Sequence, residues 1–561
     1  MIIFKHKYLL LIFAIIVCQA KQLEAEVSSL VVDNLTTFVD GNASPYNQLG
    51  PGDTLFILSG TRDFLQIKNL TGTAAGPIII INKGGVVSID AFNYYGISIQ
   101  NCRYFRLTGT GSIGNFYGIK IIYVSGGAGL GIGGMSSDYE VDHISIENTF
   151  IGGFYGKTDP DCTFAATRDN FTQFNTRIHD NYIANVANEG MYIGSTKYHG
   201  QTVNCNGHDT LLLPHVLEGV WVYNNIINHV GWDGIQVSSS VSDCHVFGNL
   251  VLYDSQEESV GQMSGISLGG GSKCDCYNNY ISQGKGNGIE SHGLGGYRIF
   301  NNIIVDAGRT FQPGDTTLMK HGIYVSDVSV EADSSFYILY NDIINPKSDG
   351  IRFNSMISRN NLIASNLIVN PGNYDYYENG NTSFTGNDAY IMIPDTISQV
   401  DLQHNFLTRY LDSALVSPVD YTILPGSPLI DAAFSNSVGI TFDYYHHLRP
   451  FGITNDIGAF EFDPAVVGIK PGLLLQTRQA VVFPNPVKTV LTIKYQSEFA
   501  APVILSVFNL QGNLLLQNQR NNMPGEVQQI QIDVGTLSPG LYLYQLRNND
   551  QLSSGRFIKI R

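Results

Sequence analysis

The sequence predicts an all-β protein: a parallel β-solenoid followed by a small C-terminal β-sandwich. Two short motifs alternate along most of the chain, and each has an apolar residue at every second position, as a half-buried strand does. The composition agrees, because only 14% of the 561 residues are charged while 59 are glycine. Typical soluble domains contain nearer ~25% charged residues. A surface made of neutral side chains and glycine-containing turns is expected of a β protein with many turns.

The N-terminus has the features of a secretory signal peptide, which we place at residues 1–20. Lys5, His6 and Lys7 precede an apolar run that is too short for a comfortable membrane span. We expect cleavage after Ala20, with Ala25 as the alternative. No later stretch is long and apolar enough to span a membrane.

Of the seven cysteines, Cys18 lies in the expected signal peptide, and six remain. An even number in an exported chain is compatible with disulfides. Cys162 and Cys205 are a plausible pair within one long insertion. Buried apolar thiols are the alternative for some of the six.

The first repeated motif is a glycine followed by alternating apolar residues. Its shortest separations, Gly96 to Gly118 and Gly265 to Gly288, match the ~20–25 residues of one solenoid coil. In such a coil, alternate Ile and Val residues point inward and stack on those of the next coil. The copies begin at Gly96, Gly118, Gly190, Gly234, Gly265, Gly288, Gly322 and Gly350.

The second motif is an asparagine followed by β-branched or apolar residues. Asn tolerates the left-handed backbone of tight turns, and one Asn per coil can form a ladder of side-chain amide hydrogen bonds along the axis. A β-sandwich of hairpins is the competing interpretation, but it explains the fixed order of the two motifs less well. The copies begin at Asn148, Asn181, Asn225, Asn249, Asn279 and Asn302, with Asp342 in place of Asn in the next copy.

These repeats resemble the right-handed parallel β-helix proteins of the pectin-lyase-like superfamily over residues 31–462. Gly52-Asp53-Thr54-Leu55 is similar to the opening coil of that family, and Asp456-Ile-Gly-Ala-Phe-Glu461 is similar to its closing segment. The resemblance implies a right-handed parallel β-helix and says little about the substrate. The catalytic motifs of that family are not found in this sequence. Ser291-His292-Gly293 matches one of them only in part, so no catalytic residue is assigned from the resemblance.

The pattern changes after Phe462. Residues 463–480 have the composition of a linker, and short alternating strands follow, with Val482-Phe-Pro-Asn-Pro486 and Leu537-Ser-Pro-Gly-Leu-Tyr542 among them. Residues 481–561 resemble the sorting domain of the type IX secretion system of Bacteroidetes-like bacteria. The resemblance implies export by that machinery, removal of this domain, and a mature protein that is secreted or attached to the cell surface. An adhesive β-sandwich is the alternative.

Aligned Gly-Ile copies predict two outward rows of side chains. One row holds the residue before each glycine, and the other holds the residue two positions after it, with neighbouring coils ~4.8 Å apart. Aromatic rings beside hydrogen-bonding groups on a long groove suit a polysaccharide. We expect catalysis from Glu189, Asp233, Lys320 and His321, and substrate binding from Tyr192, Trp232, Gln236, Glu290, His292, Tyr324 and Arg352. Long insertions at 195–218, 255–264 and 309–320 are expected to wall this groove.

Two reactions fit these residues, with a polysaccharide lyase slightly favoured over a glycoside hydrolase. For β-elimination, Lys320, His321 or Tyr324 is the base, and Arg352 neutralises the substrate carboxylate. For hydrolysis, Glu189 and Asp233 are the acid and base, ~10 Å apart if one coil intervenes, which favours the inverting geometry.

A non-catalytic glycan-binding or adhesin-like surface protein is the alternative to an enzyme, because the outward positions of any solenoid are polar. We predict no set of metal ligands, and Ca²⁺ is left open as another source of the positive charge that a lyase needs. The net charge of -16 argues against nucleic acid as a partner, and we expect a monomer.

Overall fold

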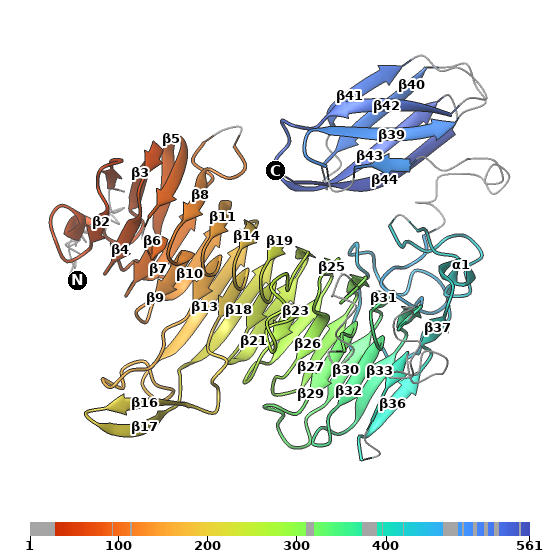
Figure 1. Cartoon of the computed structure of the whole chain (residues 1–561), viewed down its shortest axis with the longest axis horizontal. Coiled ribbons are helices and arrows are strands. Elements are labelled where there is room, and N and C mark those ends of the chain that lie inside the picture. The colour runs from red at the N-terminus through yellow and green to blue at the C-terminus, as the bar shows by residue number, and fades with distance from the viewer. Residues whose placement is uncertain are drawn as a thin grey trace, which may run out of the picture.

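The structure is a computed structural model. It describes residues 28–92, 94–112, 115–309, 319–372, 390–394, 397–418 and 420–463, and in the C-terminal part 481–484, 487–496, 502–509, 514–520, 527–548 and 551–560. The expected signal peptide, the linker after residue 463 and most of the 309–320 insertion therefore lie outside the described residues. Figure 1 shows successive coils stacked along one axis, with the C-terminal strands in a separate body.

The described coils are parallel, and each typical coil contributes three strands. The first two strands of every coil belong to one 23-stranded parallel sheet that bends at a corner, so it forms two stacks. The first stack contains β1 (Ser29–Val32), β7 (Arg103–Thr108), β10 (Ser137–Asp142), β13 (Thr172–His179), β18 (Val216–Tyr223), β21 (Ser240–Phe247), β24 (Cys274–Tyr277), β27 (Tyr297–Phe300), β30 (Phe336–Leu339), β33 (Asn361–Ala364) and β36 (Val400–Gln403).

The second stack lies beyond that corner. Two long strands of the opening coils, β3 (Thr54–Arg62) and β5 (Ile78–Ala91), run through both stacks. The other strands are β8 (Ile119–Val124), β11 (Ile144–Thr149), β14 (Tyr182–Val186), β19 (Ile226–Val230), β22 (Leu250–Leu252), β25 (Tyr280–Ser282), β28 (Ile303–Val305), β31 (Asp342–Ile344), β34 (Leu367–Val369) and β37 (Phe406–Thr408).

The third strand of each coil belongs to a twelve-stranded parallel sheet that carries the Gly-Ile motif, with one exception. Gly118 precedes β8 of the second stack, so the expectation that Gly96 and Gly118 are equivalent positions one coil apart was wrong. The strands of the twelve-stranded sheet are β2 (Phe38–Asp40), β4 (Leu65–Lys68), β6 (Tyr95–Gln100), β9 (Ala128–Gly133), β12 (Phe154–Gly156), β15 (Met191–Ile193), β20 (Ile235–Val237), β23 (Ser264–Leu268), β26 (Asn287–Ser291), β29 (Ile323–Ser326), β32 (Ile351–Asn354) and β35 (Ile391–Met392). Short elements outside the coils are η1 (Tyr46–Gln48), α1 (Leu411–Ala414) and the hairpin β16 (Gln201–Cys205) and β17 (His208–Leu212). The predicted parallel β-helix is confirmed.

The glycine of the Gly-Ile motif faces the core and marks a bend. A Cβ on Gly234 would lie 2.6 Å from Val251 Cγ1 and 2.4 Å from the Gly265 carbonyl oxygen, and the next residue, Ile235, is fully buried. Two consecutive inward residues break the strict alternation of a strand. Asp233 and Gln236 therefore lie on the same outer face, as expected, but the reason given by alternation was wrong. Residues three positions apart would face opposite sides of a regular strand, and only this bend brings both outward.

The predicted asparagine ladder is present at the corner between the two stacks. Each side chain donates from Nδ2 to Oδ1 of the next at 2.9–3.1 Å, and most of the ladder is buried. The prediction was wrong for two residues. Asn148 bonds the Ile122 carbonyl and is outside the ladder, and Asn341 rather than Asp342 continues it. The members are Asn181, Asn225, Asn249, Asn279, Asn302, Asn341, Asn366 and Asn405.

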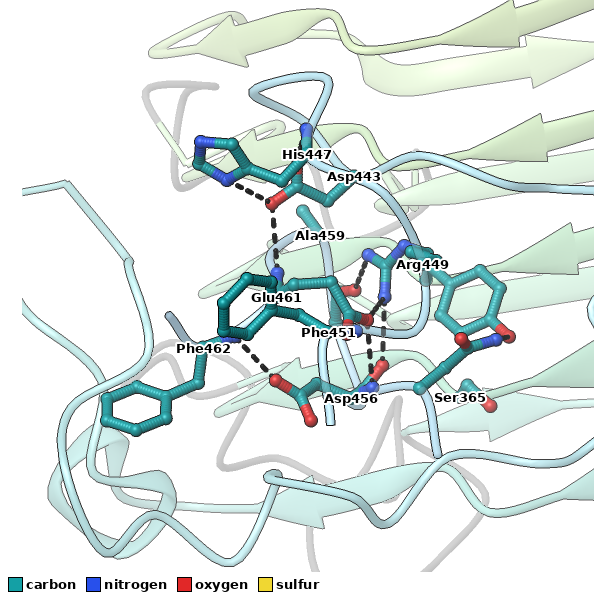
Figure 2. A network of polar contacts seen from close by, with 12 residues as sticks. Ser365, Asp443, His447, Arg449, Phe451, Asp456, Ala459, Glu461 and Phe462 are labelled. Carbon is teal, nitrogen blue, oxygen red and sulfur yellow. Dashed lines mark hydrogen bonds and ion pairs between the residues drawn. The ribbon is translucent and has the colours of Figure 1, made fainter. Parts of the chain in front are cut away.

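The segment after α1 folds back along the outside of the last coils and packs a second hydrophobic core against them. Figure 2 shows its polar centre, where Arg449 Nη1 lies 2.6 Å from Glu461 Oε1 and both side chains are fully buried. Asp443 Oδ2 accepts the Glu461 backbone N–H, and Asp456 Oδ2 accepts that of Phe462. The predicted closing segment thus seals one side of the coils.

The C-terminal strands form two antiparallel sheets around their own core, as expected for a small β-sandwich. One sheet contains β38 (Val481–Phe483), β39 (Val490–Gln496) and β42 (Val527–Asp533); the other contains β41 (Leu514–Arg520), β40 (Val503–Phe508), β43 (Gly540–Asn548) and β44 (Gln551–Lys559).

The six remaining cysteines include both disulfides and buried free thiols, the two states expected from the sequence. Cys162 and Cys205 form the expected disulfide within the insertion. A second disulfide, Cys244–Cys274, joins adjacent coils of the first stack. Cys102 and Cys276 are buried free thiols.

Candidate functional site

The register of the twelve-stranded sheet aligns one of the two predicted rows. Strands β15, β20, β23, β26, β29 and β32 pair in parallel, in this order. Residues two positions after the glycine therefore follow one another directly along the coils. This row consists of Tyr192, Gln236, Ser267, Glu290, Tyr324 and Arg352.

The residues before the glycines lie beside that row on the same outer face. Contacts between the two rows establish this: Tyr155 Oη donates to Glu189 Oε2 at 2.9 Å, and Ser264 Oγ donates to Glu290 Oε2 at 2.8 Å. In both pairs, one partner precedes a glycine and the other belongs to the row of the preceding or following coil. The predicted residues consequently share one surface over several coils.

Glu189 and Asp233, the two carboxyl groups expected to be catalytic, are each 2% exposed. Burial raises the pKa of Glu189, against the lowering effect of the Tyr155 hydrogen bond and the Lys157 charge. Burial also holds the pKa of Asp233 well above its usual range, and the charges of Glu290 and Glu189 raise it further. Asp233 Oδ1 has no hydrogen-bond partner among the described residues. Burial and the neighbouring negative charges therefore favour the protonated form of Asp233.

The separation expected for this pair was wrong. Gly190 N–H bonds the Asp233 carbonyl oxygen at 3.0 Å, and β15 pairs directly with β20, so no coil lies between Glu189 and Asp233. Their backbones are one strand spacing apart, about 4.8 Å, rather than two. The 195–218 insertion leaves the coil between β15 and β18 and adds no strand to the twelve-stranded sheet, which is why chain distance overestimated the gap.

The pKa of Glu290 is shifted in the opposite direction to that of Asp233. Burial alone would raise the pKa of Glu290, but hydrogen bonds from His292 and Ser264 and the charges of His292 and Lys320 lower it to about 2. His292 Nε2 lies 2.5 Å from Glu290 Oε1, and Asn287 Nδ2 donates to Oε2 at 3.1 Å. A carboxyl group with a lowered pKa and one with a raised pKa thus lie on the same face.

Asp254 belongs to this acidic group, and sequence reasoning missed it. The residue is 1% exposed, and burial raises its pKa to about 6 against hydrogen bonds from Ser255 and the Gly286 backbone. Its charge contributes to the raised pKa of Asp233. Asp254 follows β22 of the second stack and so lies outside the aligned Gly-Ile copies. The only hint of it in the sequence is an aspartate two residues after the apolar run Leu250–Leu252.

The side chains of His321 and Arg352 both contact the Asp349 carboxylate. Asp349 Oδ2 lies 3.2 Å from His321 Nδ1 and 3.1 Å from Arg352 Nη1. Burial lowers the pKa of His321, despite the Asp349 carboxylate, so the imidazole stays neutral. The His321 ring stacks on Tyr324 at a centroid distance of 5.5 Å. Lys320, 8% exposed, supplies positive charge to Glu290 and Asp254.

Aromatic side chains cluster at the Glu189 end of the surface. Tyr192 packs edge to face with Tyr155 at 5.7 Å, and Lys157 Nζ lies 4.5 Å from the Tyr192 ring centroid. Tyr155 and Lys157 come from β12 and the residue after it, one coil before the aligned copies that were considered. Trp232 is half-buried. Its backbone N–H bonds the Asn188 carbonyl oxygen, and its carbonyl oxygen accepts the Ser255 N–H, which ties it to the neighbouring coils. Gln236 is buried next to Tyr192 in the row.

One group of described residues has the spacing of metal ligands, and it lies elsewhere. Ligand atoms of Glu140, Asp142 and His179 lie within 4.8 Å of one another on β10 and β13 of the first stack. Arg106 Nε already lies 3.0 Å from Glu140 and 2.7 Å from Asp142, so both carboxylates have a cation. Ca²⁺ takes six to eight oxygen ligands, and two paired carboxylates with an imidazole do not fit it.

Residues 481–560 match the family model of a secretion system C-terminal sorting domain. The match confirms the resemblance seen in the sequence and places the protein at the cell surface or in the extracellular space. Among the residues that the structure describes, no helix is long and apolar enough to cross a membrane. No curated protein matches the chain.

Several solved structures are similar to the chain at low identity. Pectate lyase Pel9A is 13% identical, with 78% of this chain and 98% of that chain covered and a TM-score of 0.38. An alginate lyase from Paenibacillus sp. str. FPU-7 is 13% identical, with 59% and 99% covered and a TM-score of 0.36. XylC in complex with xylose is 10% identical, with 77% and 98% covered and a TM-score of 0.41. The strand pairings described above carry the fold assignment: the chain is a secreted parallel β-helix protein with a type IX C-terminal sorting domain.

Proposed function

We propose that the protein is an extracellular glycoside hydrolase that cleaves a polysaccharide lying along the outer face of the twelve-stranded sheet. The observation that carries this proposal is the carboxyl pair Glu189 and Asp233, which sits on adjacent coils with both pKa values raised and that of Asp233 raised well above its usual range. Glycosidases need one carboxylic acid and one carboxylate across the scissile bond. Unequal environments of two neighbouring carboxyls assign these roles.

Asp233 is the general acid in this mechanism. Its proton passes to the glycosidic oxygen as the bond to the anomeric carbon breaks. Glu189, which Tyr155 and the Lys157 charge hold closer to ionisation, is the base or nucleophile on the other side of the bond. Tyr192 and Gln236 border the pair in the same row and provide a ring and an amide for the sugar.

A hydrolase is a better match than a lyase for the charge of the surface. A uronate substrate would bring its carboxylate towards Glu189, Glu290 and Asp254, and like charges at such distances repel. The lyase remains the second candidate because of one observation. His321 is a neutral imidazole stacked on Tyr324, with Arg352 next to both, which is a base beside a cation.

The experiment incubates the full-length chain with a panel of neutral and uronate polysaccharides. The hydrolase predicts new reducing ends without the absorbance of unsaturated uronates. Asp233→Asn and Glu189→Gln should lower the rate by at least ~100-fold while binding persists. Glu331→Gln, an exposed residue outside the site, is the matched control.

Other outcomes identify the alternatives. Unsaturated products that disappear in His321→Gln would assign the lyase, and a dependence on added Ca²⁺ would identify the neutralising cation. Binding without cleavage across the panel would favour the non-catalytic glycan-binding protein and overturn the proposal.

A further inference from the structure

Ser326, His292 and Glu290 form a continuous hydrogen-bonded chain that the proposed hydrolase does not use. Ser326 Oγ lies 2.5 Å from His292 Nδ1, and His292 Nε2 lies 2.5 Å from Glu290 Oε1. Glu290 and His292 come from β26 and the residue after it, and Ser326 ends β29 of the next coil. Because an ionised carboxylate only accepts, His292 donates from Nε2, and in the neutral form of the ring its Nδ1 can accept the serine hydroxyl proton.

The carboxylate of this chain is held in place from several sides. Ser264 Oγ and Asn287 Nδ2 both bond Glu290 Oε2, which leaves Oε1 aimed at the imidazole. The pKa of Glu290 is lowered to about 2, so the group stays charged at every pH at which the fold is expected to work. Ser326 is half-buried, and the His292 side chain is 22% exposed, so a substrate can reach the hydroxyl.

We propose that Ser326 is a nucleophile activated by His292 and Glu290, and that this site hydrolyses esters. A hydroxyl, an imidazole and a carboxylate connected in this order are the parts that acyl transfer requires, whatever the fold that carries them. The substrate is an acyl ester on a sugar hydroxyl, because the site shares the outer face with Glu189 and Asp233. That last step rests on the proposed polysaccharide function, whereas the esterase chemistry does not.

The reaction balances with water as the only co-reactant. Ser326 Oγ attacks the ester carbonyl carbon while its proton moves to His292 Nδ1, and Glu290 stabilises the imidazolium. The sugar oxygen leaves with that proton and frees the hydroxyl. Water then attacks the acyl-serine with His292 again as the base, which releases the carboxylic acid and restores Ser326.

Asn354 is placed to stabilise the negative oxygen of the tetrahedral intermediate. It is in direct register with Ser326 on the next coil, β32. Among the described residues, its Nδ2 has one hydrogen-bond partner, the Tyr324 hydroxyl at 3.4 Å, and such a long contact lets the amide turn to a new acceptor. A side-chain amide is a known donor for such an oxyanion.

The test treats the full-length protein with a fluorophosphonate probe, which reacts with activated serine hydroxyls, and maps the modified peptide. We expect modification at Ser326, loss of labelling in Ser326→Ala, and labelling at least ~100-fold slower in His292→Gln. Ser242→Ala, an exposed serine of the first stack, should label as the wild type does. An unlabelled wild type, or a label on another serine, would overturn the proposal, and this holds even if Ser326→Ala does not fold.

A second assay separates this site from the hydrolase. The wild type should release acetate from an acetylated polysaccharide and from an aryl acetate, and Asp233→Asn should retain both activities while losing depolymerisation. Labelling of Ser326 with aryl acetate cleavage alone would keep the esterase and sink the polysaccharide function. Depolymerisation without labelling would keep the hydrolase and sink the esterase.

Discussion

Asp254 is a buried carboxyl whose titration should appear in the stability of the fold. Its pKa is raised to about 6 in the folded state, mainly by burial, from a usual value near ~3.9 in an unfolded chain. The folded state therefore binds the proton more tightly than the unfolded state does. Stability falls as pH rises through this window, and above pH ~6 the full penalty, roughly 2–3 kcal/mol, is present.

Asp254→Asn removes the charge and keeps an acceptor for Ser255 and the Gly286 backbone. We expect the variant to unfold at a higher temperature than the wild type at pH 8, and to be indistinguishable from it near pH 4. Thermal unfolding at the two pH values measures this difference. Asp243→Asn, whose side chain is 60% exposed, is the control. An equal effect at both pH values would contradict the assignment.

Sequence reasoning found most side chains of the surface but not their partners. Alternation within one strand predicts which residues face outward, so Glu290, Tyr324 and Arg352 were recovered in one row. It carries no information on which turns of other stacks approach that row. Asp254 arrives from the second stack and Lys157 from the preceding coil, and the pKa values of Asp233 and Glu189 depend in part on these two charges.

The asparagine ladder should contribute strongly to stability at the scale of a single turn. Asn279 donates to Asn302 and to the Val246 carbonyl, and its own oxygen accepts from Asn249. Asn279→Ala removes these bonds and also the acceptor of the buried Asn249 backbone N–H, which we expect to cost roughly 3 kcal/mol or more. Denaturant unfolding checks this, with the exposed Asn47→Ala as the control. A loss equal to that of the control would show that the ladder is dispensable.

The inward glycine makes a second prediction within one strand. Gly129 of β9 is in register with the motif glycine Gly96 of β6. A Cβ on Gly129 would lie 2.2 Å from Ile146 Cγ2, whereas a Cβ on Gly131 would meet nothing within 4 Å. Gly129→Ala should therefore destabilise by at least roughly 1–3 kcal/mol, and Gly131→Ala should be near neutral. Unfolding of the two variants side by side provides the comparison. Similar losses in both would contradict the inward orientation of the motif glycine.

The strand elements were predictable because the repeat makes each coil an independent copy of the same pattern. The members of the asparagine ladder were harder to predict. Asn341 and Asp342 both precede the same apolar pair, and only the geometry of the turn shows that Asn341 belongs to the ladder. The bend at the motif glycine was not visible either. It arises because Gly234 and Ile235 both pack inward, a departure from period 2 that the sequence letters alone do not mark.

At the scale of the whole molecule, the sorting domain and the β-helix have separate hydrophobic cores. Deletion of residues 481–561 should therefore leave the coils folded but retain the protein inside a bacterium that has the type IX machinery. Cell fractionation with the full-length chain as control measures this. Equal amounts outside the cell for both forms would contradict the role of the domain.

Cleavage of a polysaccharide by the full-length protein, with Asp233→Asn beside the wild type, tests the central claim most directly. The proposed hydrolase predicts new reducing ends without unsaturated uronate, and a rate at least ~100-fold lower in the variant while glycan binding is kept. The same rate in Asp233→Asn, or no cleavage of any polysaccharide by the wild type, would contradict it.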